Sequence, residues 1–317
     1  MVRFMKIPKI NSEDFISLED VSREEIFKLF EYSKYLKGLV KKKKFVKILE
    51  NKTLAMIFEK NSTRTRVSFE TGMLQLGGHA LFLSGNEIQL GRGETIGDTA
   101  KVLSRYNDGI MIRTFAHDKV IELAKYADIP VINGLSDFHH PCQAFADYFT
   151  IFEREKDIAN VKLTYIGDGN NVANSLLIGA AIIGTNITIA SPKKFEPDIN
   201  VVKKAYKLAS KSHSQIYITD DIDKAVENAD YIYTDVWVSM GQEKDTAKKR
   251  KIFTKYVVDN KLLKKTGKDT KVLHCLPAHR GEEITDEVMD GSSSIVFEQA
   301  ENRMHCQKAI LCALMGR

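Results

Sequence analysis

The sequence predicts an α/β protein of two domains, each a parallel sheet flanked by helices, joined by a bridging helix and a C-terminal helix. Three observations support this class. Short apolar runs alternate with helical patterns from end to end, which is typical of parallel sheets covered on both faces. The 317 residues suffice for two hydrophobic cores. The stretch 141–155 is amphipathic and contains no Gly or Ser, as expected of a helix between domains.

Apolar, β-rich runs predict the strands. In the first half they lie at 53–58, 79–83, 109–113 and 129–132. In the second half they lie at 162–166, 186–190, 215–219, 231–237, 271–276 and 294–298. Helical patterns near 62–76, 95–106 and 117–126 separate the first four strands.

These elements divide into a first domain at 1–140, an interdomain helix at 141–155, a second domain at 156–300 and a last helix at 301–317. Open sheets of this kind bind ligands at the carboxyl ends of their strands. The unusual polar clusters of the sequence follow the predicted strands, so we expect the site at those strand ends.

Composition excludes several classes of protein. Apolar residues make up 43% and charged residues 28% of the chain, which is ordinary for a globular protein. The net charge of +5 is modest and the aromatic residues are not interleaved with a basic stripe, so we expect no nucleic-acid partner. No apolar window approaches the ~20 residues needed to cross a bilayer, so we expect no membrane partner. The four cysteines lack C-x-x-C spacing, so we expect neither a disulfide framework nor a zinc site. We expect a cytoplasmic protein.

The most informative segment is Ser-Thr-Arg-Thr-Arg at 62–66, set between an apolar run and a helical pattern. A strand, a polar turn and a helix start together offer free backbone N–H groups and a positive dipole end to a phosphate. Ser62 suits the N-cap position, which leaves Thr63, Arg64 and Thr65 in the first turn. An ordinary capped helix with solvated arginines is the alternative.

Two other clusters follow strands of the first half. Arg113 ends an apolar run, where its charge needs a partner, either a salt bridge or a bound anion. His139 and His140 open the bridging helix, and no further ligands at metal spacing accompany them. We therefore expect a neutral imidazole from this pair that donates to a carbonyl oxygen, and a Gln143 that accepts from an amide.

In the second half, the segment 167–171 (Gly-Asp-Gly-Asn-Asn) follows a strand and opens a helix. It lacks the third glycine of the dinucleotide fingerprint, because Val172 takes that place, and the next strand has no acidic residue for a ribose. A nicotinamide cofactor is therefore disfavoured. The asparagine side chains are better interpreted as substrate contacts.

Three later clusters also belong to predicted strand or helix ends. Asp235 precedes Ser-Met-Gly at 239–241 and a charged stretch, which indicates a cation site under a mobile lid or else a plain surface loop. Cys275 ends another apolar run, where cysteine is most often a core residue. Arg303 is expected on the first turn of the last helix, where its charge opposes the dipole and suggests a partner anion.

Together these motifs resemble the carbamoyltransferase family, and its ornithine-using members most closely. Seven motifs occur in the family's order over almost the whole chain: 58–66 (FEKNSTRTR), 113–115 (RTF), 140–143 (HPCQ), 167–171 (GDGNN), 235–241 (DVWVSMG), 274–277 (HCLP) and 301–303 (ENR). One such motif is weak, whereas seven in order are specific.

The resemblance implies transfer of a carbamoyl group from carbamoyl phosphate to L-ornithine, giving citrulline, without a metal or organic cofactor. It implies a carbamoyl-phosphate domain at 1–140, completed by the helix 301–317, and an ornithine domain at 156–300. The carbamoyl-phosphate residues would be Ser62, Thr63, Arg64, Thr65, Gln89, Arg113, His140, Gln143, Cys275, Leu276 and Arg303, with Arg113, His140, Cys275 and Arg303 catalytic.

The resemblance also implies how the amino acid and the subunits are arranged. Asn171 and the Met240 backbone would bind the ornithine carboxylate, and Asp235 and Ser239 its α-ammonium. Gln89 would complete the site of a neighbouring subunit, which implies a homotrimer or an assembly of trimers.

Departures from the family pattern set the alternatives. Lys60 and Asn61 stand where aspartate-using members have a single proline, and Arg92 stands where their loop uses lysine, which disfavours aspartate as acceptor. Ala278 replaces an arginine that many ornithine-using members carry. The alternatives are a carbamoyltransferase for putrescine or an N-acylated ornithine, a Rossmann-type oxidoreductase, and a silent carbamoyl-phosphate binder.

Overall fold

The computed structural model describes residues 5–238 and 246–316. The chain divides into two compact units. Unit 1 comprises Met1–Phe149 and Glu301–Arg317, and unit 2 comprises Thr150–Ala300. Each unit contains one sheet in which every pairing is parallel, with helices between the strands, which confirms the predicted fold class.

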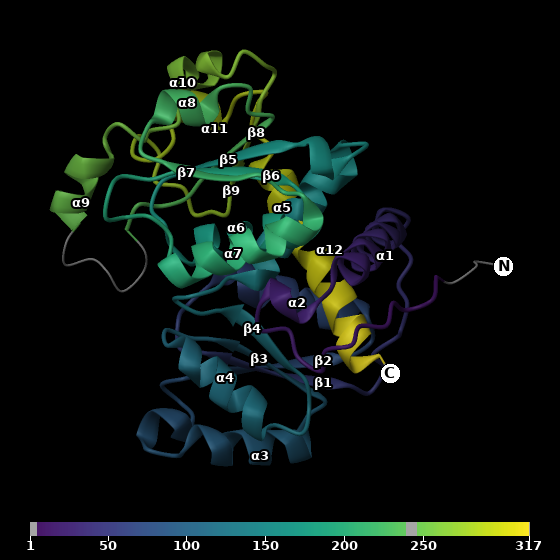
Figure 1. Cartoon of the computed structure of the whole chain (residues 1–317). Coiled ribbons are helices and arrows are strands. Elements are labelled where there is room, and N and C mark those ends of the chain that lie inside the picture. The colour runs from purple at the N-terminus through teal and green to yellow at the C-terminus, as the bar shows by residue number, and fades with distance from the viewer. Residues whose placement is uncertain (1–4, 239–245, 317) are drawn as a thin grey trace. The chain divides into compact units, whose positions relative to one another are not determined.

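Unit 1 has a four-stranded sheet of order β2-β1-β3-β4. Its strands are β1 (Thr53–Phe58), β2 (His79–Ser84), β3 (Gly109–Arg113) and β4 (Val131–Leu135). Its helices are α1 (Arg23–Lys41), α2 (Thr63–Gln75), α3 (Ile96–Tyr106) and α4 (His117–Tyr126). Figure 1 shows α3 and α4 on one face of this sheet and α2 on the other.

Two long helices cross the division of the chain. Helix α5 (Pro141–Arg154) begins in unit 1, where Phe145 and Phe149 pack on Phe30 of α1 with ring centroids 4.9 and 5.8 Å away. Helix α12 (Val296–Met315) ends in unit 1. Polar groups in this part of α12 form hydrogen bonds with segments that come much earlier in the sequence. Lys37 Nζ donates to Asn302 Oδ1 at 2.7 Å, and Lys308 Nζ donates to Gln75 Oε1 at 2.8 Å.

Unit 2 has a five-stranded sheet of order β7-β6-β5-β8-β9. Its strands are β5 (Lys162–Ile166), β6 (Asn186–Ala190), β7 (Ile216–Thr219), β8 (Tyr231–Thr234) and β9 (Lys271–His274). Its helices are α6 (Asn171–Ile183), α7 (Ile199–Ser212), α8 (Ile222–Val226), α9 (Thr246–Phe253), α10 (Asn260–Lys265) and α11 (Asp286–Met289). Helices α6 and α7 cover one face of the sheet, and α8, α10 and α11 lie on the other side (Figure 1).

The core of unit 2 explains how the segment after β8 is fixed. Trp237 is 3% exposed and packs on Phe253 of α9 with ring centroids 5.8 Å apart. Both belong to one apolar cluster with Ile232 and Val272 from the sheet. The buried indole therefore holds the chain directly after Asp235, a predicted site residue.

The structure corrects two expectations about the end of the chain. The apolar run 294–298 is not a strand: only Ser294 makes an isolated bridge, to Val272, and Val296 begins α12. Because the helix starts before Glu301, Arg303 lies beyond its first turn, and the dipole argument for an anion at Arg303 was wrong. In the described parts of the chain, no helix combines the length and apolarity needed to span a membrane.

Candidate active site

The strand order places the two candidate groups. In unit 1, β1 lies between β2 and β3, so the connections leaving β1 and β3 diverge at their carboxyl ends. Such a switch point is where open sheets bind ligands. The segment 62–66 follows β1, and Arg113 ends β3 opposite Phe58. The predicted phosphate residues thus share one edge of the sheet.

Ser62 caps α2 as predicted and starts a chain of hydroxyl contacts. Its Oγ accepts from Thr65 N–H at 3.2 Å and donates to Thr65 Oγ1 at 3.0 Å. Arg303 Nη2 donates to the same Thr65 Oγ1 at 3.1 Å. Thr63 is exposed, Arg64 is half-buried and Thr65 is buried. The helix start and the distant Arg303 are therefore one group within unit 1.

The charges of three arginines act on His140. The imidazole is 5% exposed, and burial lowers its pKa well below the ordinary value; the charges of Arg303, Arg113 and Arg64, in that order, lower it further. A neutral ring in a cluster of positive charge can donate one hydrogen bond without competing for the anion. This state of His140 agrees with the interpretation made from the sequence.

Gln143 lies in the first turn of α5 and is 1% exposed. Its Nε2 donates to Asp147 Oδ1 at 2.7 Å, which fixes the orientation of the amide. Its Oε1 is buried and has no hydrogen-bond partner among the described residues. A buried acceptor without a partner is costly, so this oxygen suits an amide donor from a ligand.

Lys60 supports the predicted phosphate-binding edge of the first sheet, a role that the sequence did not predict. Lys60 is 4% exposed; its Nζ is hydrogen-bonded to Asp137 and lies 4.3 Å from the centre of the Phe115 ring. This contact connects the loop before α2 with the loop before His140. Gln89 lies on a 3-10 helix, Gln89–Arg92, with an exposed side chain.

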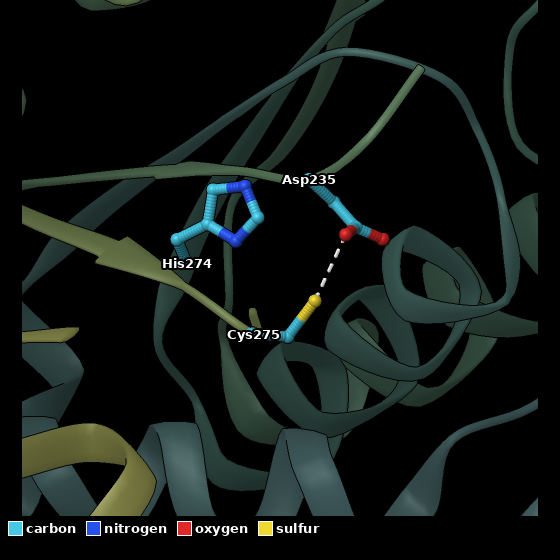
Figure 2. A group of neighbouring side chains, drawn as sticks. All are labelled: Asp235, His274 and Cys275. Carbon is cyan, nitrogen blue, oxygen red and sulfur yellow. Dashed lines mark hydrogen bonds between the residues drawn. The ribbon is translucent and has the colours of Figure 1, made fainter. Parts of the chain in front are cut away.

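The candidate group of unit 2 lies at the switch point between β5 and β8. Asp235 follows β8 and is 6% exposed. Its Oδ2 accepts from Asn170 Nδ2 at 2.7 Å, and its Oδ1 accepts from the Cys275 thiol at 2.9 Å. Figure 2 shows this thiol directed at the carboxylate. Asp235 and Cys275, predicted separately, therefore lie together.

Asn170 and Asn171 have different positions. Asn170 caps α6, with its Oδ1 accepting from Val172 N–H at 2.9 Å, while its Nδ2 fixes Asp235. Asn171 is the first residue of α6 and is partly exposed. Gly169 is required here because a Cβ would lie 2.2 Å from the Pro197 nitrogen. The sequence predicts both asparagines as substrate contacts, whereas the structure shows Asn170 capping the helix and orienting the Asp235 carboxylate.

Asp235, His274 and Cys275 have ligand atoms within 4.8 Å of one another, a set that could hold a metal ion by residue type. The imidazole is already engaged at both nitrogens. Its Nδ1 accepts from Leu276 N–H at 2.9 Å, and its Nε2 lies 3.0 Å from Glu283 Oε1. A metal on His274 would have to displace one of these contacts, so the set suits an amine substrate better than an ion.

A buried ion pair supports the other side of this group. Lys249 Nζ lies 2.5 Å from Asp168 Oδ2, and their side chains are 10% and 12% exposed. Burial raises the pKa of Asp168, whereas the Lys249 charge lowers it. Lys249 belongs to the charged stretch after Ser-Met-Gly, for which the sequence suggests a mobile lid or a plain surface loop, so its buried pairing was not predicted. Ser239 and Met240 lie outside the described residues.

Comparisons with known proteins agree with these groups. Residues 13–153 match the family model described as aspartate/ornithine carbamoyltransferase, carbamoyl-P binding domain, and residues 159–314 match its Asp/Orn binding domain. The chain is 53% identical over 310 residues to the ornithine carbamoyltransferase of Bacillus cereus, covering 98% of this chain and 96% of the relative.

Solved structures are similar over the same length. The ornithine carbamoyltransferase from Pyrococcus furiosus is 52% identical with a TM-score of 0.94, covering 97% of this chain and 98% of that one. The anabolic ornithine carbamoyltransferase from Campylobacter jejuni is 43% identical with a TM-score of 0.88, covering 95% and 98%.

Proposed function

The chain belongs to the aspartate/ornithine carbamoyltransferase family, and we propose that it transfers the carbamoyl group from carbamoyl phosphate to the side-chain amine of L-ornithine, giving L-citrulline and phosphate. One observation carries this proposal. The charges of Arg64, Arg113 and Arg303 act on a buried His140 and, with its burial, favour the neutral imidazole beside the switch point of the first sheet. That group offers positive charge for a phosphate and a hydrogen-bond donor for a carbonyl oxygen.

Unit 1 has the chemistry that carbamoyl phosphate requires. We assign its phosphate to Ser62, Thr63, Arg64, Thr65 and Arg113. The carbamoyl oxygen would accept from Arg113, His140 and Arg303, and its NH₂ would donate to Gln143 Oε1, which has no partner among the described residues. These donors are held before the reaction, so they stabilise the oxyanion that forms as the amine attacks.

Unit 2 has the chemistry that an amino acid requires. Asp235 is a buried carboxylate fixed by Asn170, and it suits the α-ammonium group. Asn171 and the Met240 backbone would bind the carboxylate, and Ser239 the ammonium; Cys275 and Leu276 would lie at the reacting amine. A neutral amine attacks the carbamoyl carbon, the C–O bond to phosphate breaks, and phosphate leaves with the bonding electrons and takes up the proton that the amine nitrogen loses.

We also assign the chain to a homotrimer or an assembly of trimers, with Gln89 completing the site of a neighbour. Exposed apolar residues on α2 and β2 support a contact between copies: Val67, Leu74 and Leu81 are 53%, 71% and 48% exposed. No disulfide joins any of the four cysteines, which lie in the described part of the chain, and this supports the cytoplasm as its location.

A colorimetric assay for ureido products tests the reaction. Carbamoyl phosphate is offered with ornithine, putrescine, N-acetylornithine or aspartate. We expect product with ornithine alone. Product with putrescine or N-acetylornithine would reassign the acceptor, and no product with any amine would reject the reaction.

A further inference from the structure

Glu283 is a buried carboxylate with no role in the reaction as described. It lies between β9 and α11, and its side chain is 0% exposed. Its Oε1 accepts from His279 N–H at 2.6 Å and lies 3.0 Å from His274 Nε2. A buried carboxylate is costly unless its hydrogen bonds hold something in place.

His274 passes the contact on to the next turn. Its Nδ1 accepts from Leu276 N–H at 2.9 Å, so this nitrogen carries no proton and the proton is on Nε2, donated to Glu283. The His274 backbone N–H donates to Gln299 Oε1 at 2.9 Å. The ring therefore has one tautomer and one orientation, and both depend on Glu283.

The turn that His274 holds is one that leucine does not adopt readily. Leu276 has φ +59°, in the left-handed region that favours glycine. Cys275, the residue before it, donates its thiol hydrogen bond to Asp235. Both Cys275 and Leu276 are contacts of the reacting groups in the proposed function. An unfavourable backbone at such a site persists only when its surroundings enforce it.

We propose that Glu283 is a positioning residue that acts through His274 to hold the Cys275–Leu276 turn in the conformation that meets the reacting amine. This inference rests on the proposed function. Glu283 touches no substrate, and the part of it that matters is the acceptor Oε1. Its other oxygen, Oε2, has no hydrogen-bond partner among the described residues, so glutamine can replace the group with the acceptor retained.

Glu283→Ala and Glu283→Gln in the full chain separate positioning from bulk stability. Glu283→Ala removes the acceptor, so we expect kcat with ornithine to fall about 10- to 100-fold, the scale of a small misplacement of reacting groups. The affinity for inorganic phosphate, measured by calorimetry, should stay within about twofold, because unit 1 holds the phosphate. Glu283→Gln should restore kcat to within about threefold of the starting protein.

The thiol of Cys275 gives a second measurement that needs no activity. Cys142, Cys306 and Cys312 are buried, whereas Cys275 is partly exposed, so a coloured disulfide reagent in the folded protein reports on this turn. We expect faster modification of Cys275 in Glu283→Ala and an unchanged rate in Glu283→Gln. Should Glu283→Ala fail to fold, His274→Asn is the second variant. Asparagine keeps an acceptor near Leu276 N–H but loses the hydrogen bond to Glu283, so we expect the same fall in kcat and the same faster modification of Cys275.

Three results would overturn the inference. These are an unchanged kcat and thiol rate in Glu283→Ala, a parallel loss of phosphate affinity, and a Glu283→Gln variant as impaired as Glu283→Ala. A starting protein that forms no product with ornithine would instead reject the proposed function, and the thiol rates would still decide whether Glu283 holds the turn.

Discussion

Arg303 donates a hydrogen bond from Nη2 to Thr65 Oγ1 at 3.1 Å, although the two residues are 238 positions apart in the chain. The contact joins α12 to the first turn of α2 within unit 1. Because Thr65 also receives the Ser62 hydroxyl, the guanidinium is aimed at the start of the helix, where the leaving phosphate is proposed to bind. Loss of the Thr65 hydroxyl should disturb the orientation of Arg303 without removing the arginine's charge from the chain.

Replacing Thr65 tests this orientation. Thr65→Val removes the acceptor for Arg303 at similar volume, and we expect kcat to fall by about tenfold, equivalent to the ~1.4 kcal/mol of one hydrogen bond. Thr65→Ser keeps the hydroxyl and should stay close to the original activity. Steady-state kinetics with saturating substrates compare the two variants, and equal activities would show that the contact has no part in catalysis.

Arg64→Ala and Asp235→Asn should affect different substrates. Arg64→Ala removes a cation at the helix start. The affinity for carbamoyl phosphate should fall roughly 10- to 100-fold, because a charged hydrogen bond contributes ~1.5–3 kcal/mol. Asp235→Asn keeps the shape but removes the charge for the ammonium group, so KM for ornithine should rise by a similar factor. Equal losses for both substrates in both variants would contradict the division of roles between the units.

The activity should rise with pH. The attacking amine must be neutral, and a side-chain amine with a pKa near ~10.4 is mostly protonated at pH 7. His140 should add no second titration to this pH–rate profile, because its lowered pKa leaves the imidazole already neutral. We expect kcat/KM for ornithine to increase steadily from pH 6 to 9, and a flat profile would show that amine attack does not limit the rate.

His140 should also make stability depend on pH. Its folded pKa is lowered, so below the unfolded value of ~6.5 the unfolded chain binds a proton that the folded chain does not. The contribution to stability is therefore complete above that pH and is lost as the pH falls below it. Urea unfolding at pH 7.5 and 5.5 should show a smaller decrease for His140→Gln than for the original protein. An identical decrease would mean that His140 protonates in the folded state.

The ion pair of Lys249 and Asp168 offers a stability test with a matched control. Lys249→Met leaves a buried carboxylate without its cation, which should cost about 3–5 kcal/mol of the free energy of unfolding. Lys265 and Asp223 form a comparable pair with side chains 49% and 69% exposed, so Lys265→Met should change stability by less than ~1 kcal/mol. Urea unfolding measures the free energy of unfolding of both variants. Equal losses would show that the buried pair contributes no more than the exposed one.

Local patterns predicted most of the framework correctly. The apolar runs at 53–58 and 109–113 are β1 and β3, and their carboxyl ends meet because parallel strands share one edge. This is why Arg113 and the segment 62–66 could be assigned to one site. The run 294–298 was misassigned because its apolar residues, including Val296, begin a helix.

Residues whose state depends on distant partners were not predictable. Lys249 stands in a charged stretch that suggests solvent, yet its partner Asp168 is 81 positions away and both are buried. Glu283 likewise stands in a polar segment that suggests solvent, yet its side chain is buried and lies 3.0 Å from His274 of β9. Only the assembled sheet brings these charges together, so sequence spacing contains no signal for them.

The division of the chain also bears on its synthesis. Unit 1 is interrupted: its strands all precede residue 150, whereas Arg303 and Asn302 belong to its last segment, Glu301–Arg317. A ribosome completes the whole of unit 2 before it makes these residues. During translation the nascent chain can form its first sheet but lacks Arg303 at the helix start and the partner of Lys37. The set of residues proposed to bind carbamoyl phosphate is therefore completed last, although its first segment, 62–66, is made early in translation.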